Sequence, residues 1–340
     1  MELQQNVPLS QYSSMRLGGN ARYLTEVKSI EETKRAVGWG KENNLPLIMI
    51  GSGCNIIWRD EGFPGLVMVN KITGFEVTED EIGTYVNIGG GENWDQTVDK
   101  TVKLGLTGIE CLSLIPGTAG ATPVQNVGAY GQDISQSLVT VTAFDMTSGT
   151  MVTIPASDCN FAYRTSIFKT SPGKYFITNI TLMLHKGQLM PPFYSSLAGY
   201  LEQHTITDYS AQNIRNAIID IRSQKLPDPN QVANCGSFYT NPIVDRSLLS
   251  SIEAEYTDVP HWSKDDDKVK LSAAWLVEKA GYADFYDQST GIATWPKQPL
   301  VFTNKSASST VDLLRFSAAV QAKVKELFGV DLQIEPLLIP

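Results

Sequence analysis

The sequence predicts an α+β protein with more than one domain, on three observations. The chain has 340 residues, more than one hydrophobic core usually organises. Its apolar fraction of 42% and charged fraction of 19% are those of an ordinary globular protein. Short apolar runs typical of strands are mixed with capped stretches of helical periodicity, and the helical stretches dominate the last third. Changes in this pattern predict domains at residues 1–66, 67–208 and 209–340.

Five stretches are expected to be helices because they combine capping residues with apolar positions on one face. They are residues 29–44, the segments that follow Asn93 and Ser210, and residues 269–281 and 309–328. Ser29 with Glu32 three positions later is a capping-box pattern. The last helix has one apolar face, made of Leu313, Phe316, Val320, Val324 and Leu327, and Gly329 ends it.

Strands are expected where short apolar runs lie between turn residues. In chain order they are 47–50, 56–58, 66–69, 85–88, 138–146, 151–154 and 175–184. The glycine-rich segment Gly51-Ser52-Gly53-Cys54-Asn55 therefore leads from one strand into another. In a Rossmann fingerprint the glycine loop opens a helix, so this context excludes that fold here.

Charge and reactive side chains exclude several classes of function. The 27 basic and 36 acidic residues give a net charge of −9, which lacks the footprint of a nucleic-acid binder. The three histidines have no helical ligand spacing, so we expect no metal site. The four cysteines lie far apart, and we see neither a secretory signal nor a membrane span. These features predict a protein of the reducing cytoplasm without a membrane partner.

Two glycine-rich segments could form a cofactor site. Glycine lets the main chain approach a ligand closely, and consecutive amides can form a nest for a diphosphate without any lysine. Taken alone, Gly51 and Gly53 are better explained by a tight turn. The second segment, residues 114–131, is too apolar for a solvent loop, and it would suit burial around a flat cofactor.

These segments and three later motifs resemble the UDP-N-acetylenolpyruvoylglucosamine reductases, flavoenzymes of peptidoglycan precursor synthesis. The later motifs are Tyr163-Arg164-Thr165-Ser166-Ile167-Phe168, Lys225-Leu226-Pro227 with Gly236-Ser237-Phe238, and Glu335-Pro336. Each motif is weak alone, but they occur in order from about residue 9 to the C-terminus. The resemblance is to the longer subtype, which has a tyrosine-bearing substrate loop.

The resemblance implies a two-part FAD-binding domain of the vanillyl-alcohol-oxidase type, followed by a substrate-binding domain. It implies FAD as cofactor and NADPH as hydride donor, with an enolpyruvyl ether reduced to a lactyl ether. The implied FAD contacts are Gly51, Ser52, Gly53, Asn55, Pro116, Gly117, Ala121, Gly128 and Tyr130. It also implies a monomer.

Three residues match the catalytic positions of the family. Arg164 would hold the substrate carboxylate, Glu335 would share that carboxylate, and Ser237 would donate a proton to carbon. Each has an ordinary alternative, since an arginine after a tyrosine, a glutamate before a proline and a Gly-Ser-Phe turn are common. A serine is a poor acid by itself, so Ser237 would need nearby donors, with Lys225 or a water as the natural candidates.

Six residues are expected to contact the substrate, and some positions depart from the family pattern. The contacts are Tyr163, Tyr194, Lys225, Asn241, Trp262 and Gln298. Tyr194 could instead be a hairpin tyrosine packed on the sheet. Trp262 replaces a tyrosine, Thr240 and Ala283 lie where lysines occur, and Cys54 replaces a serine. These departures concern substrate affinity and leave the reaction class unchanged.

Two other functions remain open from the sequence. Another FAD-dependent oxidoreductase with the same fold could act on a hydroxy acid or a sugar, because function resides in the site and not in the fold. A non-catalytic carrier would bind flavin and nucleotide without consuming NADPH. The presence of Arg164, Ser237 and Glu335 argues against both.

Overall fold

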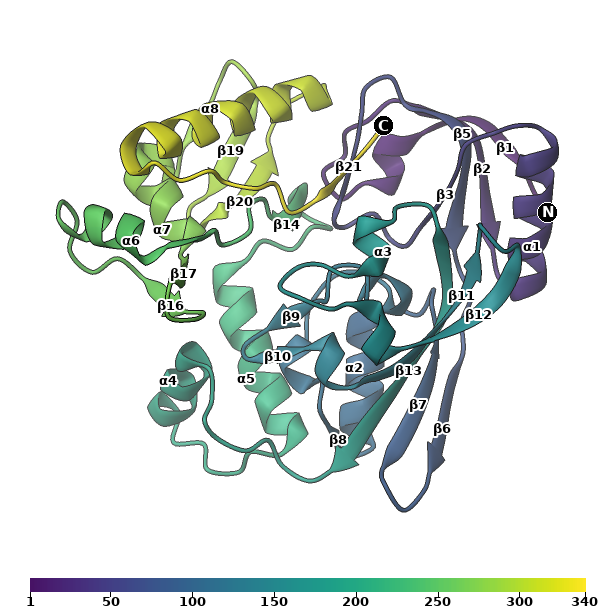
Figure 1. The fold of residues 1–340 in the computed structure, drawn as a ribbon, viewed down its shortest axis with the longest axis horizontal. Coiled ribbons are helices and arrows are strands. Elements are labelled where there is room, and N and C mark those ends of the chain that lie inside the picture. Colours follow the sequence, from purple (N-terminus) through teal and green to yellow (C-terminus); the bar gives the residue numbers. More distant parts are fainter. The chain divides into compact units, whose positions relative to one another are not determined.

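The computed structural model describes residues 1–340, and the chain divides into two compact units (Figure 1). Unit 1 consists of Met1–Val7, Ala21–Ser52 and Pro64–Gln224. Unit 2 consists of Pro8–Asn20, Gly53–Phe63 and Lys225–Pro340. Each unit is thus assembled from three separate stretches of chain. The division at residues 66 and 208 stays a prediction.

The first sheet of unit 1 has the strand order β1–β2–β5–β3. Its strands are Gln4–Pro8, Asn20–Val27, Phe63–Asn70 and Leu47–Ile50, and α1 spans Ile30–Glu42. Ala36 and Val37 of α1 share an apolar cluster with Leu66 and Met68 of β5. The N–H of Glu32 donates to Ser29 Oγ at 3.1 Å, which confirms the predicted N-cap.

The second sheet of unit 1 is antiparallel, in the order β12–β11–β13–β7–β6, and β8 pairs with β13. In this order the strands are Thr150–Pro155, Leu138–Asp145, Tyr175–Lys186, Thr84–Gly89 and Phe75–Glu79, with β8 at Leu106–Thr107. Val98 and Val102 of helix α2 (Trp94–Lys103) lie in the same buried apolar cluster as Val86 and Ile88 of β7. The strands predicted at 138–146 and 151–154 are confirmed, and they form an antiparallel hairpin in which Asp145 of β11 pairs with Thr150 of β12.

The segment between β8 and β11 contains only short elements, and much of it is buried. They are η2 (Glu110–Leu112), η3 (Ala119–Ala121), β9 (Gly128–Ala129), β10 (Gln132–Asp133) and η4 (Ile134–Gln136). The buried carboxylate of Glu110 accepts hydrogen bonds from Thr107 Oγ1, the N–H of Gly108 and Gln132 Nε2, at 2.6–3.1 Å. These bonds fix the start of the segment.

The remaining helical elements of unit 1 follow β12 and β13. They are η5 (Ala156–Cys159), α3 (Ile167–Thr170), α4 (Ser195–Gln203) and α5 (Ala211–Lys225). The predicted helix after Ser210 is therefore confirmed as α5. Its buried Arg215 is bidentate to Asp95 of α2, at 2.7 and 3.1 Å. Fork-to-fork pairing of this kind fixes one helix against the other.

Unit 2 contains two sheets and a parallel strand pair. The four-stranded sheet has β14 (Asn234–Ser237), β20 (Gln298–Asn304), β19 (Ile292–Trp295) and β18 (Tyr286–Asp287). The three-stranded sheet has β15 (Ile243–Asp245), β17 (Lys268–Leu271) and β16 (His261–Ser263). The pair is β21 (Leu337–Ile339) with β4 (Ile56–Trp58).

The helices of unit 2 confirm one prediction and correct another. They are η1 (Leu9–Tyr12), α6 (Arg246–Glu253), α7 (Ala273–Val277) with its extension Glu278–Tyr282, and α8 (Thr310–Phe328). Helix α8 buries Leu313, Phe316, Val320 and Val324 of the predicted apolar face, leaves Leu327 half-buried, and ends at Gly329 with φ 69°. The helix predicted over 269–281 was wrong at its start, because exposed and buried residues alternate there as in a strand. It begins after Ser272, whose Oγ accepts the N–H of Trp275.

The core of unit 2 draws on all three stretches that compose it. Met15, Leu17 and Ile57 from the two early stretches lie in the same apolar cluster as Phe302 and Phe316. The Phe302 ring of β20 stacks on Phe238, which directly follows β14, and meets Phe316 of α8 edge to face. The C-terminal stretch thus shares its core with two segments from the start of the chain. None of the helices is both long and apolar enough to cross a membrane.

Candidate active site

In unit 1, three glycine-containing segments pack directly against one another. They contain Gly51, Gly90, and the pair Gly117 and Gly120. The N–H of Gly120 donates to the carbonyl of Gly90 at 2.9 Å, and the N–H of Trp94 donates to the carbonyl of Gly117 at 3.1 Å. A Cβ at Gly120 would lie 2.9 Å from Gly90 Cα, and one at Gly51 would clash with Thr118 Oγ1. The three segments therefore form a wall of main chain, which suits a flat ligand bearing a diphosphate.

The close approach at Gly51 gives a direct test of this wall. Gly51→Ala is expected to purify with substoichiometric flavin, because the new methyl group pushes Thr118 and its loop away. Adding Thr118→Ala should restore flavin content, because the nearest remaining side-chain atom, Cβ, would be at an ordinary 3.4 Å. The ratio of flavin to protein absorbance measures both. If the single variant retains full flavin, this packing is not needed for the cofactor.

Four non-glycine residues around this wall have left-handed backbones. They are Leu114 (φ 56°), Asn126 (φ 45°), Tyr130 (φ 50°) and Arg164 (φ 55°). Such conformations cost roughly 1 kcal/mol each and persist where the surroundings impose them, often at functional sites. Two of the four, Tyr130 and Arg164, are residues that the sequence assigns to the cofactor and the substrate.

Arg164 is held against the second glycine segment. Its Nη2 donates to the carbonyl of Gly128 at 2.9 Å, and its guanidinium lies 5.4 Å from the ring centre of Tyr163. The following residues are fixed by Ser166, whose Oγ donates to the carbonyl of Val124 at 2.6 Å and caps α3. Unit 1 thus brings the predicted catalytic arginine next to the predicted cofactor contact Gly128.

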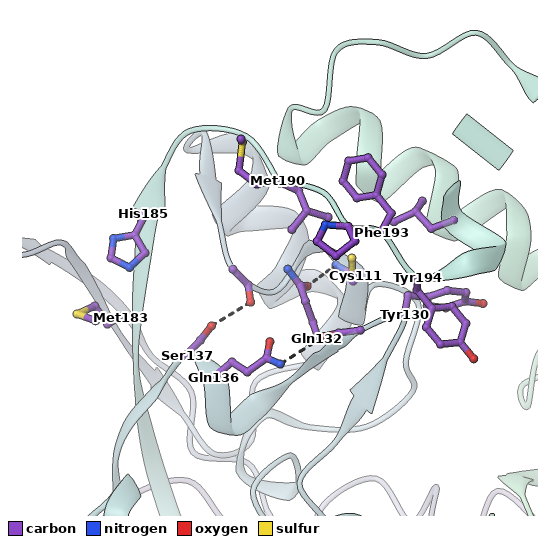
Figure 2. A pocket seen from close by; sticks show the side chains of 15 residues that line it. Cys111, Tyr130, Gln132, Gln136, Ser137, Met183, His185, Met190, Phe193 and Tyr194 are labelled. Carbon is purple, nitrogen blue, oxygen red and sulfur yellow. Dashed lines mark hydrogen bonds between the residues drawn. The ribbon is translucent and has the colours of Figure 1, made fainter. Parts of the chain in front are cut away.

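Tyr130 and Tyr194 lie together in unit 1. Their rings meet edge to face with centres 6.0 Å apart, at one side of a cavity of about 290 Å³ (Figure 2). Tyr194 precedes α4 and is 42% exposed, so it is no core tyrosine. Burial raises the pKa of Tyr130, whose hydroxyl accepts a hydrogen bond from Arg222.

Arg222 is a residue that the sequence analysis missed. Its Nη2 donates to the carbonyl of Leu114 at 3.2 Å, and burial lowers its pKa while Tyr130 and Asp95 raise it. It thereby links the two ends of the 114–131 segment. No local motif marks it, since it lies in an ordinary polar stretch of α5.

In unit 2, Ser237 and Glu335 lie on neighbouring extended segments. The N–H of Glu335 donates to the carbonyl of Phe238 at 2.9 Å, and Tyr239 bridges to Ile334 in antiparallel fashion. Glu335 is only 8% exposed. The N–H of Leu337 donates to the carbonyl of Asn55 at 3.0 Å. A predicted cofactor contact and two predicted catalytic residues therefore converge in this unit.

Cys235 lies two residues before Ser237, and its pKa is affected by the charge of Glu335. Burial raises the pKa of this thiol from 9.0 to about 12, and the negative charges of Glu335 and Cys54 contribute. The four cysteines are free thiols, and Cys111, Cys159 and Cys235 are buried. The Glu335 carboxylate is thus close enough to influence β14.

The buried thiol predicts a stability change at high pH. Between about pH 9 and pH 12 the unfolded chain loses the Cys235 proton, whereas the folded protein keeps it. The stabilising contribution of the protonated thiol to the free energy of unfolding is therefore complete below about pH 9. It falls by about 1.4 kcal/mol per pH unit and is lost near pH 12. Cys235→Ala should flatten the decline in unfolding free energy by this slope, measured with denaturant from pH 8.5 to 10.5. Parallel curves would contradict the raised pKa.

Lys225 and Gln298 lie near the β19–β20 hairpin of unit 2. Trp295 Nε1 donates to the carbonyl of Lys225 at 3.1 Å, and Trp295 pairs with Gln298 across the turn. Gln298 Oε1 is buried and has no hydrogen-bond partner. A buried hydrogen-bond acceptor without a donor destabilises the folded protein, unless a ligand supplies the donor. The sequence analysis did not single out Trp295.

Asn241 and Trp262 lie at the three-stranded sheet of unit 2. Asn241 Oδ1 accepts the N–H of Ala273 at 2.9 Å, which fixes the orientation of the amide. Trp262 is 39% exposed and stands directly across from Lys270 of β17.

The predicted site residues are divided between the units. Unit 1 contains Gly51, Ser52, Pro116, Gly117, Ala121, Gly128, Tyr130, Tyr163, Arg164 and Tyr194, whereas unit 2 contains Gly53, Asn55, Lys225, Ser237, Asn241, Trp262, Gln298 and Glu335. No three histidine, cysteine or acidic side chains cluster to hold a metal.

The fold and the glycine wall define an FAD-binding protein. Residues 21–155 match the FAD binding domain model, and residues 228–339 match the C-terminal domain of UDP-N-acetylenolpyruvoylglucosamine reductase. The chain belongs to the UDP-N-acetylenolpyruvoylglucosamine reductase family. It is 35% identical to the reductase of Ralstonia nicotianae over 99% of both chains. It is 37% identical to that of Thermobifida fusca, covering 98% of this chain and 97% of the relative.

Solved structures confirm the predicted fold class. The crystal structure of the reductase from Thermus caldophilus matches with a TM-score of 0.69 and 20% identity over the whole of both chains. A 6-hydroxy-D-nicotine oxidase from Arthrobacter nicotinovorans matches with a TM-score of 0.52 and 12% identity, covering 97% of this chain and 86% of the oxidase. The chain is therefore an FAD-dependent oxidoreductase by family, with an FAD-binding domain and a C-terminal α+β domain.

Proposed function

We propose that this protein reduces UDP-N-acetylglucosamine enolpyruvate to UDP-N-acetylmuramate, using NADPH, in peptidoglycan precursor synthesis. The observation that carries the proposal is the pairing of the Ser237 and Glu335 segments in unit 2, through the 2.9 Å bond from the N–H of Glu335 to Phe238. The family membership supports the same substrate. We further propose that the protein acts as a cytoplasmic monomer.

The cofactor wall fits the proposed chemistry. Main-chain amides of the glycine segments would hold the FAD diphosphate without added positive charge, in agreement with the net charge of −9. FAD, when bound and reduced by NADPH, supplies a hydride to the methylene carbon of the enolpyruvyl group. The residues of this chain would hold the carboxylate of that group and deliver one proton to the adjacent carbon.

Arg164 and Glu335 would act on the substrate carboxylate. As hydride adds, negative charge moves toward this carboxylate, and a guanidinium fork stabilises that charge more strongly than it stabilises the ground state. The bond from Arg164 Nη2 to the carbonyl of Gly128 would orient the fork. Glu335, nearly buried, would donate a hydrogen bond from its protonated form to the same group.

Ser237 would give its hydroxyl proton to the carbon next to the carboxylate. The balance is one hydride and one proton added across the double bond, with NADPH oxidised and no bond to the protein formed. An alkoxide on Ser237 needs a nearby donor, and Lys225 or a water molecule is the natural candidate. Reprotonation from solvent would complete the cycle.

The uridine end would be recognised in unit 2. The buried and unpartnered Gln298 Oε1 would accept the N3–H of the uracil ring, which removes the cost of leaving that acceptor unpaired. The exposed ring of Trp262 offers a stacking surface, and Lys225 offers a charge for the diphosphate.

An anaerobic experiment with the purified protein separates the two half-reactions. NADPH should bleach the flavin absorbance near the oxidised maximum, and UDP-N-acetylglucosamine enolpyruvate should then restore it. Bleaching without recovery would favour the alternative, another FAD-dependent oxidoreductase acting on a hydroxy acid or a sugar. No bleaching and no FAD binding would overturn the proposal altogether.

A further inference from the structure

The proposed nucleotide site is short of positive charge. Among the six residues expected to contact the substrate, Lys225 is the one cation, whereas the substrate diphosphate carries two negative charges. A diphosphate taken from water needs charge-assisted hydrogen bonds to offset its lost hydration. A second cation close to Asn241 and Trp262 is therefore to be expected in unit 2.

The three-stranded sheet places a lysine at this position. Ile243 of β15 and Trp262 of β16 both pair with Lys270 of β17, so these three side chains form one row on one face. Ile243 and Trp262 are 38% and 39% exposed. The opposite face, with Val269 and Leu271, is fully buried in the core. Lys270 thus projects from the solvent face.

Two observations place Lys270 beside the proposed nucleotide contacts. Its Nζ lies 5.3 Å from the centre of the Trp262 ring, a cation–π distance. The strand pairing continues past Lys270 to Asn241, since Leu271 donates to the carbonyl of Pro242 and Ala273 donates to Asn241 Oδ1, both at 2.9 Å. Asn241, Trp262 and Lys270 therefore share one end of the sheet.

We propose that Lys270 binds the diphosphate of the sugar nucleotide and at the same time holds the Trp262 ring for stacking on the base. This inference rests on the proposed function. Lys268, two residues earlier on the same face, has different surroundings, because its Nζ is paired with Asp245 at 2.7 Å. Of the two lysines on this strand, Lys270 is the one that lies beside the Trp262 ring.

The test measures binding of UDP and of uridine to the flavin-loaded protein by isothermal titration calorimetry. Lys270→Gln should weaken UDP binding by about ten-fold or more, the value of one charge-assisted hydrogen bond, and change uridine binding much less. Lys270→Arg should retain most of the UDP affinity, because the charge and the ring contact remain. Lys268→Gln is the matched control, with the same loss of charge on the same strand, and should bind UDP normally.

Several outcomes would overturn the assignment. Equal weakening of UDP and uridine by Lys270→Gln would mean that the lysine acts through Trp262 alone. An equal effect of Lys268→Gln would mean that general charge attracts the ligand. If the wild-type protein binds neither UDP nor the enolpyruvyl substrate, the proposed function itself has failed. Thermal unfolding of each variant shows whether the fold is intact.

Discussion

Replacing Ser237 with alanine should leave flavin reduction by NADPH intact and slow substrate-driven reoxidation roughly a thousand-fold. The methyl group removes the only proton that Ser237 can give to the substrate carbon, while hydride transfer to the flavin needs no such donor. Stopped-flow absorbance under anaerobic conditions measures the two steps separately. A loss confined to the second step is expected for a group that acts on the substrate and not on the flavin.

The Ser237→Ala experiment has a matched control in the same unit. Ser247→Ala removes an exposed hydroxyl from α6 and should change neither half-reaction. If Ser237→Ala reoxidises at the wild-type rate, Ser237 has no part in the mechanism. If flavin reduction collapses as well, the variant has disturbed the cofactor site, and the flavin spectrum will show it.

A double-mutant cycle of Arg164→Gln and Glu335→Ala should show strong coupling. Each single variant is expected to slow reoxidation by about a hundred-fold or more, since each removes a group that stabilises the developing charge on one carboxylate. The double variant should be much less impaired than the product of the two effects, with a coupling of about 1–3 kcal/mol. The cycle is measured as the rate constant for flavin reoxidation by saturating substrate, in the wild type, the two single variants and the double variant.

Arg246→Gln serves as the control partner for this cycle. Arg246 is exposed on α6 and donates to main-chain carbonyls of the 265–266 turn. Its effect should simply add to that of Glu335→Ala. Multiplicative rate losses for Arg164 and Glu335 would show that they act on separate groups, and the shared-carboxylate mechanism would then be wrong.

The regular elements could be predicted where the sequence carries its own boundaries. Helix α1 has Ser29 as its cap, and α8 has Ser309 before it and Gly329 after it, so both were placed within a residue or two. Strand β17 was missed because its four residues are followed at once by a helix, and Val269, Ala273 and Leu276 together imitate helical spacing. Residues 268–271 form a strand because they pair with β15 and β16, and no local sequence signal reveals this pairing.

Parts of the site depend on contacts between residues distant in sequence. The glycine wall could be predicted, because close backbone contacts require glycine, and the resulting glycine-rich segments are visible in the sequence. The left-handed backbones of Tyr130 and Arg164 could not, since no residue type there announces them. Arg222 and Lys270 lie in ordinary polar stretches, and their significance comes from Leu114 and Trp262 across the fold. The site roles themselves remain predictions for the experiments above.

The three-stretch construction of unit 2 bears on how the chain can be made and divided. Residues 8–20 and 53–63 are synthesised well before residues 225–340, and β4 cannot pair until β21 has been made. The core of unit 2 therefore cannot form before its third stretch has been synthesised. A fragment beginning at residue 225 would lack Met15, Leu17 and Ile57 from its core. Exchange of this region between relatives by a single crossover would separate core residues that pack together.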